Sequence, residues 1–297
     1  MSDLASPAEL RTKIYKQAER EADKIQAWFF DEPIMIGDDL HGKCAFASQA
    51  LGKVILAIGQ DCDGWAEEFE LTAAAKRVLS FWASRPYRLG AYRTDFVFRG
   101  QSDISLIENT CRFALNGYPS VSIADVIARR RLPEHAKDAT GMDIVADMIT
   151  NLSAYFVGKS RLVVLTGDDL QNESRFLERV FADSPQQMER VDFRDLGRKV
   201  GGFDDALVLS ELALAELECL SDEILEYLSK CAFLNDPRTV FFAHDKAFFA
   251  LIQRGDFLET VLGDQDAKRF RDCLLPTYVY SHTCNVWADA RSNPSDW

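Results

Sequence analysis

Hydrophobic and polar residues alternate in two short stretches about one third of the way along the chain. Thr94 to Phe98 and Ile104 to Glu108 follow the two-residue period that is typical of half-buried strands. The segment between them, Arg99 to Asp103, combines Gly100 with polar residues that favour a turn. The pattern therefore predicts a β-hairpin.

Apolar residues recur with helical spacing in three stretches before this hairpin. The first begins at Pro7, where Ser6 and Glu9 form a capping box, and its apolar positions extend to Phe29. The other two stretches cover residues 45–58 and 71–83. We therefore expect a helical N-terminal region that ends in the hairpin.

Helical and strand patterns alternate after Met142. Helical spacing covers residues 142–157 and 173–182 and the acidic sequence that runs up to Lys230, and strand patterns cover residues 162–165, 188–193, 206–209 and 238–243. This order predicts an α/β domain with a mostly parallel sheet and helices on its faces. Ligands of such sheets gather beyond the carboxyl ends of the strands. The candidate ends are Thr166-Gly167-Asp168, Ser210-Glu211 and His244-Asp245-Lys246.

These patterns divide the chain into two units and a tail. The predicted boundaries are 1–118, 142–280 and 281–297. Residues 119–140 form a connection that carries a short helix and the basic run Arg129-Arg130-Arg131. We interpret the three arginines as a solvated helix end, with phosphate binding as the alternative.

Composition narrows the function classes. The chain has 297 residues, of which 47% are hydrophobic and 27% charged, as in ordinary globular proteins. We expect neither a membrane span nor a secretory leader. Seven cysteines without framework spacing favour reduced thiols, and hence the cytoplasm. A formal charge of -13 argues against nucleic-acid binding, because that requires a surplus of Lys and Arg.

The hairpin carries two carboxylates on neighbouring strands, Asp95 and Glu108. Magnesium prefers carboxylate oxygens and substrate phosphates, so this pair is a candidate metal site linked to a nucleotide. The competing interpretation is a pair of solvated surface charges.

Other reactive side chains carry weaker signals. His244 and Lys246 are candidate acid/base or phosphate-contacting groups, and the alternative is that this segment caps a helix. Cys273, His282 and Cys284 lack the number and spacing of ligands that zinc requires. Cys111 has no histidine partner placed beside it in the sequence and is expected to be a buried thiol.

Several short motifs together resemble those of circularly permuted ATP-grasp ligases, such as glutathionylspermidine-synthase-like enzymes and related peptide ligases. The motifs are Arg93-Thr94-Asp95-Phe96, Glu108-Asn109-Thr110-Cys111-Arg112-Phe113 with Asn116-Gly117, Val163-Val164-Leu165-Thr166-Gly167, the segment from Asn235 to Lys246, Leu275-Pro276-Thr277 and the ending Asn293-Pro294-Ser295-Asp296-Trp297. The resemblance implies that the second unit is a pre-ATP-grasp-like α/β domain.

The resemblance also implies roles for individual residues. Asp95 and Glu108 would hold Mg²⁺ on ATP, and Arg112, His244 and Lys246 would serve catalysis. Asn109 and Thr110 would be the cofactor-binding positions. Thr110 stands where the family has a metal-binding asparagine, and Asn109 would point to the opposite face, because side chains alternate along a strand.

The expected function is therefore part of a carbon–nitrogen ligase of a biosynthetic, secondary-metabolic pathway, acting on a small-molecule carboxylate or amine. The family's nucleotide clamp, with its lysine and glycine-rich loop, does not occur in these residues, so a second chain or further domain would complete the catalyst. The alternative is a non-catalytic binding or scaffold subunit that keeps the fold. A third hypothesis is an α/β transferase that uses the strand ends.

Overall fold

The protein is described by a computed structural model that covers residues 7–25, 36–100, 102–112, 117–131, 154–155, 157–169, 173–183, 187–279 and 290–292. Every structural statement below concerns these ranges. Several predicted features lie outside these ranges. They are Phe29, residues 132–153 after the basic run, with most of the predicted helix 142–157, and His282 with Cys284.

The N-terminal region is helical and ends in the predicted hairpin. Its elements are α1 (Pro7–Ile25), α2 (Asp38–Gln60), α3 (Cys62–Glu68), α4 (Ala73–Ser80), β1 (Arg93–Arg99), β2 (Asp103–Thr110) and then α5 (Tyr118–Arg131). The side chain of Thr72 caps α4 by accepting a hydrogen bond from the Ala75 N–H, 3.0 Å away. The helix-and-hairpin part of the predicted fold is confirmed.

A four-stranded parallel sheet follows. Its strands are β3 (Arg161–Thr166), β4 (Met188–Asp192), β5 (Ala206–Ser210) and β6 (Ala232–Phe233), in the order β4-β3-β5-β6. All five residues of β5 are buried, as expected for a strand covered on both faces. The predicted α/β class with a mostly parallel sheet is confirmed.

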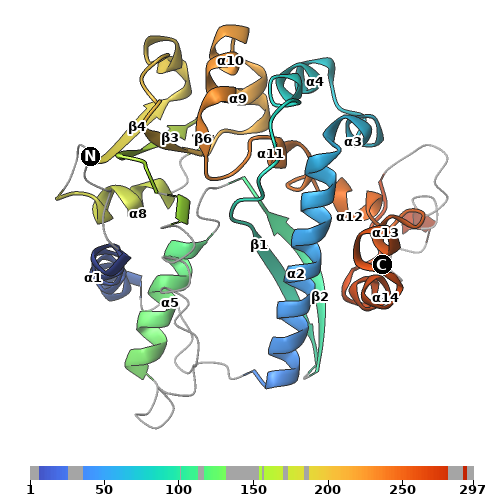
Figure 1. Cartoon of the computed structure of the whole chain (residues 1–297). Helices are drawn as coiled ribbons and strands as arrows, with labels where there is room; N and C mark the ends of the chain where they lie inside the picture. The colour runs from blue at the N-terminus through green and yellow to red at the C-terminus, as the bar shows by residue number, and fades with distance from the viewer. Residues whose placement is uncertain are drawn as a thin grey trace.

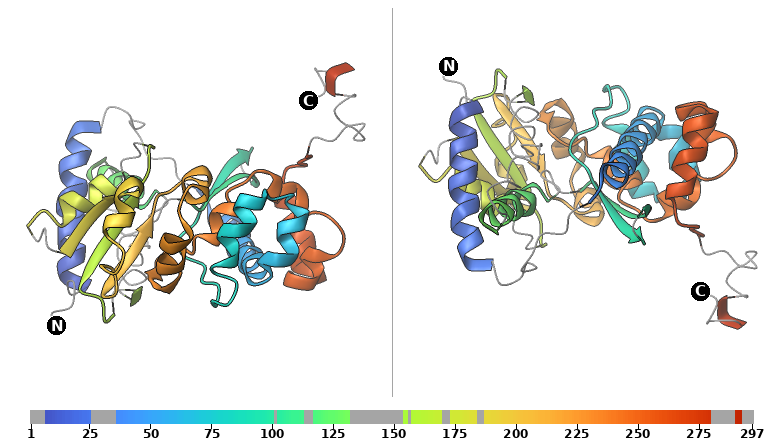
Figure 2. Two further views of the ribbon diagram at one scale, coloured as in Figure 1. Left: turned by 90° about the horizontal axis from the view of Figure 1, so that it is seen from above. Right: turned by 90° about the horizontal axis from the view of Figure 1, so that it is seen from below.

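Helices cover both faces of this sheet (Figure 1). The helices that follow β3 in the chain are α8 (Glu173–Val180), η4 (Phe193–Arg198), α9 (Leu214–Glu218), α10 (Asp222–Lys230), α11 (Arg238–Phe242), α12 (Ala247–Leu251), α13 (Phe257–Leu262) and α14 (Asp264–Cys273), of which α13 and α14 pack against α2. On one face, α1, α5 and α8 pack with Leu162, Val164, Leu207 and Leu209. Figure 2 shows α1 at one end of the molecule and α13 with α14 at the other.

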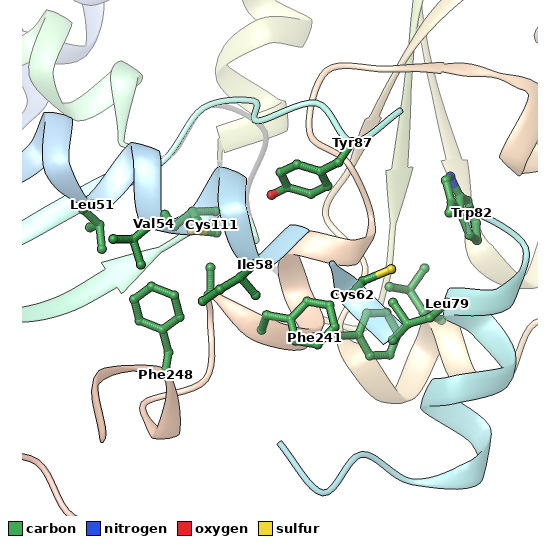
Figure 3. Close-up of a cluster of buried hydrophobic side chains, with 14 of the residues drawn as sticks. Leu51, Val54, Ile58, Cys62, Leu79, Trp82, Tyr87, Cys111, Phe241 and Phe248 are labelled. Carbon is green, nitrogen blue, oxygen red and sulfur yellow. The ribbon is translucent and has the colours of Figure 1, made fainter. Parts of the chain in front are cut away.

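The larger core lies on the opposite face of the sheet and continues under the hairpin. There Val163, Leu165 and Val208 join a cluster that contains α2, α4, α11 and α12. Figure 3 shows how Leu51, Val54 and Ile58 of α2 meet Phe241 and Phe248 from the C-terminal helices. This cluster draws on both predicted units, whose boundaries stay a prediction.

One predicted strand is wrong. Residues 238–243 contain the buried helix α11, and the strand that precedes it, β6, has only two residues. All five residues of α11 are buried. A short apolar run that is buried on all sides looks the same in sequence whether it is a strand or a helix, because neither leaves a polar face.

The basic run ends α5, as interpreted from the sequence. Arg129 pairs with Asp125 one turn earlier at 2.8 Å, and Arg130 reaches Asp23 of α1 at 2.8 Å. The second of these pairs joins α5 to α1, which lies beside it in Figure 1. Among the helices described, none combines the length and apolar character needed to cross a bilayer.

Candidate functional site

The two hairpin carboxylates lie directly opposite each other. In the antiparallel pairing of β1 with β2, Asp95 is the partner of Glu108. A β-bulge follows, because Phe96 pairs with Leu106 and leaves Ile107 as an extra residue. The hairpin therefore places both acidic side chains on one face.

Each carboxylate already has a cationic neighbour. Arg93 donates two hydrogen bonds to Asp95, at 2.7 and 3.0 Å. Lys246 lies 4.0 Å from Glu108, and both of these side chains are well exposed. Among the described residues, no group of three or more His, Cys, Asp or Glu side chains is arranged to hold a metal ion. The pair is thus an acidic position within a mixed-charge surface.

Thr110 and Asn109 point to opposite faces of β2. Thr110 shares the face of the carboxylates, where its hydroxyl accepts a hydrogen bond from Arg93 at 3.3 Å. Asn109 is buried and donates from Nδ2 to the Ala243 carbonyl at 3.2 Å and to the Cys111 sulfur at 2.8 Å. Its Oδ1 is buried and has no partner in the described part of the chain. The side chain of Asn109 thus ties the hairpin to the segment after α11.

Arg112 connects the hairpin to the parallel sheet. It donates to the Glu211 carbonyl after β5 at 3.2 and 3.3 Å, and to the Asp169 carboxylate after β3 at 3.1 Å. Only 13% of its side chain is exposed. A guanidinium can bridge several acceptors because its donors are fixed in a planar fork. The geometry gives Arg112 a positioning role between two layers.

His244 lies in the same neighbourhood, just after α11. Burial lowers the pKa of its imidazole, the positive charge of Arg112 lowers it further, and Glu108 and Asp245 oppose these effects. Its Nδ1 is buried and unpaired within the described ranges. Asp245 accepts the Ala247 N–H at 2.8 Å and so caps the start of α12. The structure therefore brings Asp95, Glu108, Arg112, His244 and Lys246 around one end of the hairpin, and their functional roles stay predictions.

The carboxyl end of β3 is already filled by protein. Glu216 of α9 accepts the backbone N–H of Asp168 at 2.6 Å and that of Ala213 at 2.6 Å. A Cβ atom placed on Gly167 would lie 2.0 Å from the Glu216 carboxylate, so a larger residue there would displace that carboxylate. Glu216 and Arg112 together occupy the edge of the sheet where sequence reasoning placed a ligand.

The motif Asn235-Asp236-Pro237-Arg238-Thr239 serves packing. Asn235 accepts the Ala91 N–H at 2.9 Å and donates to the carbonyls of Ala91 and Cys111 at 3.2 and 3.3 Å. Buried Arg238 forms a two-pronged ion pair with buried Asp236, at 2.7 and 2.9 Å. The Thr239 hydroxyl bonds the hydroxyl of Tyr87 at 2.7 Å. Sequence reasoning noticed these residues but missed that they fasten the chain before β1 to the sheet.

The architecture described so far is that of an α/β protein in which a parallel sheet and an antiparallel hairpin share one core. The family described as the AnkG N-terminal domain matches residues 60–242, more than half of the chain. The chain belongs to this family. A comparison with curated proteins gave no match.

The family assignment overturns the ligase resemblance. The interpretation as an ATP-grasp or pre-ATP-grasp ligase of a biosynthetic pathway is wrong, because the matching family is a different one. The motifs behind that resemblance were short, and two of the residues it assigned to the site, Asn109 and Arg112, make buried or half-buried structural contacts. Mg²⁺ and ATP stay predictions that neither the geometry nor the comparisons test.

Proposed function

We propose that this chain is a non-catalytic binding domain that docks a partner protein along the hairpin. Membership of the AnkG N-terminal domain family supports a binding role over the ligase role. The hairpin supplies the surface, because the larger core holds it through Ile104 and Leu106 of β2 while other apolar side chains of the hairpin stay open to solvent.

The observation that carries the proposal is the exposed edge of β1. Within the described ranges β1 pairs with β2 alone, whereas Leu106 of β2 also forms a bridge with Leu274. Val97 and Phe98 on β1 are 47% and 48% exposed, and Ile107 on β2 is 40% exposed. An edge strand presents unpaired N–H and C=O groups that a partner strand can use.

The chemistry of this edge points to an extended segment of another protein. Such a segment would pair its backbone with β1 and place side chains against Val97 on one face of the hairpin and against Phe98 on the other. Backbone pairing supplies affinity, and the side-chain contacts supply specificity.

Val97→Lys is the test of this docking strand. A lysine on an edge strand discourages pairing, so we expect it to remove the partners that the wild-type chain captures from cells. Leu214→Lys is the matched control, because Leu214 is 37% exposed on α9 and lies outside the hairpin. Quantitative mass spectrometry after affinity purification ranks the partners, and calorimetry with the purified partner measures the loss directly. A partner set that is unchanged by Val97→Lys, or lost equally with the control, contradicts the proposal.

We also place this function in a reducing compartment and propose the cytoplasm. The support is that the six described cysteines, Cys44, Cys62, Cys111, Cys219, Cys231 and Cys273, are all free thiols. Disulfides are rare where glutathione keeps thiols reduced.

A further inference from the structure

A hollow of about 270 Å³ opens at the amino-terminal edge of the parallel sheet, away from the hairpin end. Lys159 precedes β3, Asp204 precedes β5, and Cys231 precedes β6, so three strand starts contribute to its wall. The loop Arg85 to Arg88 between α4 and β1 supplies another part of the rim. This is the opposite edge from the one that Glu216 and Arg112 fill.

The lining of this hollow is basic, although the chain as a whole is acidic. Arg85, Arg88, Lys159 and Lys230 line it together with Asp204 and Asp236. By contrast, the whole chain has 34 basic against 47 acidic residues. A local reversal of charge within a concave wall concentrates the field on ligands of opposite sign.

The charges that remain after internal pairing are positive. Asp236 is neutralised by Arg238, and Lys230 pairs with Glu226 at 2.8 Å. No ion pair found among the described residues involves Arg85, Arg88 or Lys159. Three cations therefore face the hollow against one acid, Asp204.

Two of these cations lie near the same thiol. The thiol of Cys231 is half-buried in the wall, and burial raises its pKa to about 11 while Asp204 raises it and Lys159 and Arg85 lower it. Both cations must therefore lie within electrostatic reach of the same sulfur atom. The backbone of Arg85 is also fixed in place, because its carbonyl accepts a hydrogen bond from Arg238 at 3.0 Å.

An apolar hollow of about 250 Å³ adjoins the basic one. The two share Arg88, Lys159, Ala232 and Phe233, and the second adds Tyr155, Val157 and Leu207. A ligand with a charged group and a ring or short apolar part would occupy both. Together they approach the size of a small-molecule site.

We propose that Arg85, Arg88 and Lys159 form a binding site for the phosphate group of a small soluble phosphate ester, whose apolar part lies beside Tyr155 and Phe233. Arginine suits this role because its fork of donors matches phosphate oxygens, and lysine adds a point charge. The site is separate from the docking strand β1.

Calorimetric titration of the full chain with inorganic phosphate and with phenyl phosphate tests the site. We expect phenyl phosphate to bind more tightly than phosphate, because only the ester reaches the apolar hollow. Arg88→Gln and Lys159→Gln should each weaken the binding of phenyl phosphate by about tenfold, because each removes a charge-assisted contact.

The controls are Arg175→Gln and Lys268→Gln, which remove one positive charge each from exposed positions on α8 and α14, outside the hollow. We expect no change in affinity from either. Loss of binding in the controls as large as in Arg88→Gln overturns the site, and so does a wild-type chain that binds neither probe. Equal affinity for the two probes overturns the apolar half of the assignment.

Sedimentation with phosphatidylcholine vesicles that contain phosphatidic acid separates a soluble ligand from a lipid headgroup. We expect the chain to stay in the supernatant. Pelleting that Arg88→Gln abolishes would overturn the assignment to a soluble ester. Circular dichroism of each variant verifies the fold, so that a loss of affinity is read only from folded protein.

Discussion

Single side chains around the hairpin interact with several neighbours at once. His244 is half-buried, its Nδ1 has no partner in the described ranges, and Arg112 and Glu108 both act on its charge. Because burial and Arg112 disfavour the protonated ring, the imidazole is neutral at neutral pH. The charge state of His244 therefore depends in part on Arg112, a residue whose main contacts are structural.

We expect NMR titration to give His244 a pKa below the ordinary value of about 6.5. Since the folded pKa is the lower one, the contribution of His244 to stability is present above the unfolded pKa and is lost as the pH falls through the folded pKa. Arg112→Gln should raise the pKa of His244, because it removes a nearby positive charge. A pKa in the folded chain equal to or above that of the urea-unfolded chain contradicts this account.

Sequence reasoning at the residue scale predicted which face of β2 each side chain occupies, whereas the functional roles of these residues stay predictions. Alternation along β2 separated the face of Glu108 and Thr110 from that of Asn109, which depends only on strand geometry. It could not reveal that Arg112 reaches the carbonyl of Glu211, since that contact joins residues about a hundred positions apart. Contacts of this kind are set by the packing of layers, which no local pattern records.

Among the elements, α11 depends on a buried ion pair. Arg238 is 3% exposed, pairs with Asp236, and donates to the carbonyls of Trp82 and Arg85. The guanidinium also lies 5.2 Å from the ring centre of Tyr87. It thereby fixes the loop that leads from α4 into β1.

Replacing Arg238 by leucine should lower the free energy of unfolding by about 3–5 kcal/mol, because it leaves the Asp236 carboxylate buried without its partner. Urea denaturation measures the change. Arg254→Leu is the control, since Arg254 and Glu68 form an exposed pair at 3.9 Å that contributes at most about 1 kcal/mol. Similar losses of unfolding free energy for the two variants would show that the buried pair contributes no more to stability than the exposed pair.

Element prediction succeeded where a pattern had a polar face and was ambiguous where it had none. The helices α2, α8 and α10 combine buried with exposed positions, and the sequence located each of them. Among the runs without a polar face, the buried strand β5 was located correctly, but α11 was not. The run from Arg238 to Phe242 is buried throughout, so the spacing of its hydrophobic residues does not distinguish a helix from a strand. The sequence pattern was therefore assigned to a strand. Only tertiary packing distinguishes these two outcomes.

At the scale of the whole molecule, one core links parts that are distant in sequence. Residues from α2 and α4 pack with residues from β3, α11 and α12 in the same cluster, and α1 covers the other face of the sheet. The sequence predicted the layers but not that the first helix packs on the sheet that follows the hairpin. That placement is decided by which apolar faces are left to bury.

Because the core is shared, we expect the chain to unfold in one cooperative transition. Far-ultraviolet circular dichroism reports mainly the helices, and tryptophan fluorescence reports the core in part through Trp82, which is 3% exposed. The two signals should have the same midpoint in urea. Two separate midpoints would instead favour the division at residues 118 and 142 that the sequence predicted.

The carboxylate of Glu216 has a consequence for how this architecture acquires ligands. It accepts hydrogen bonds from backbone N–H groups at the carboxyl end of the sheet, where many sheets of this type bind a nucleotide. The protein therefore places its own negative charge where a cofactor would place one. Any metabolite that binds at this position must first displace the Glu216 carboxylate. Because that carboxylate is covalently part of the chain, it is always present as a competitor. The small-molecule site that we propose lies instead at the opposite rim of the sheet.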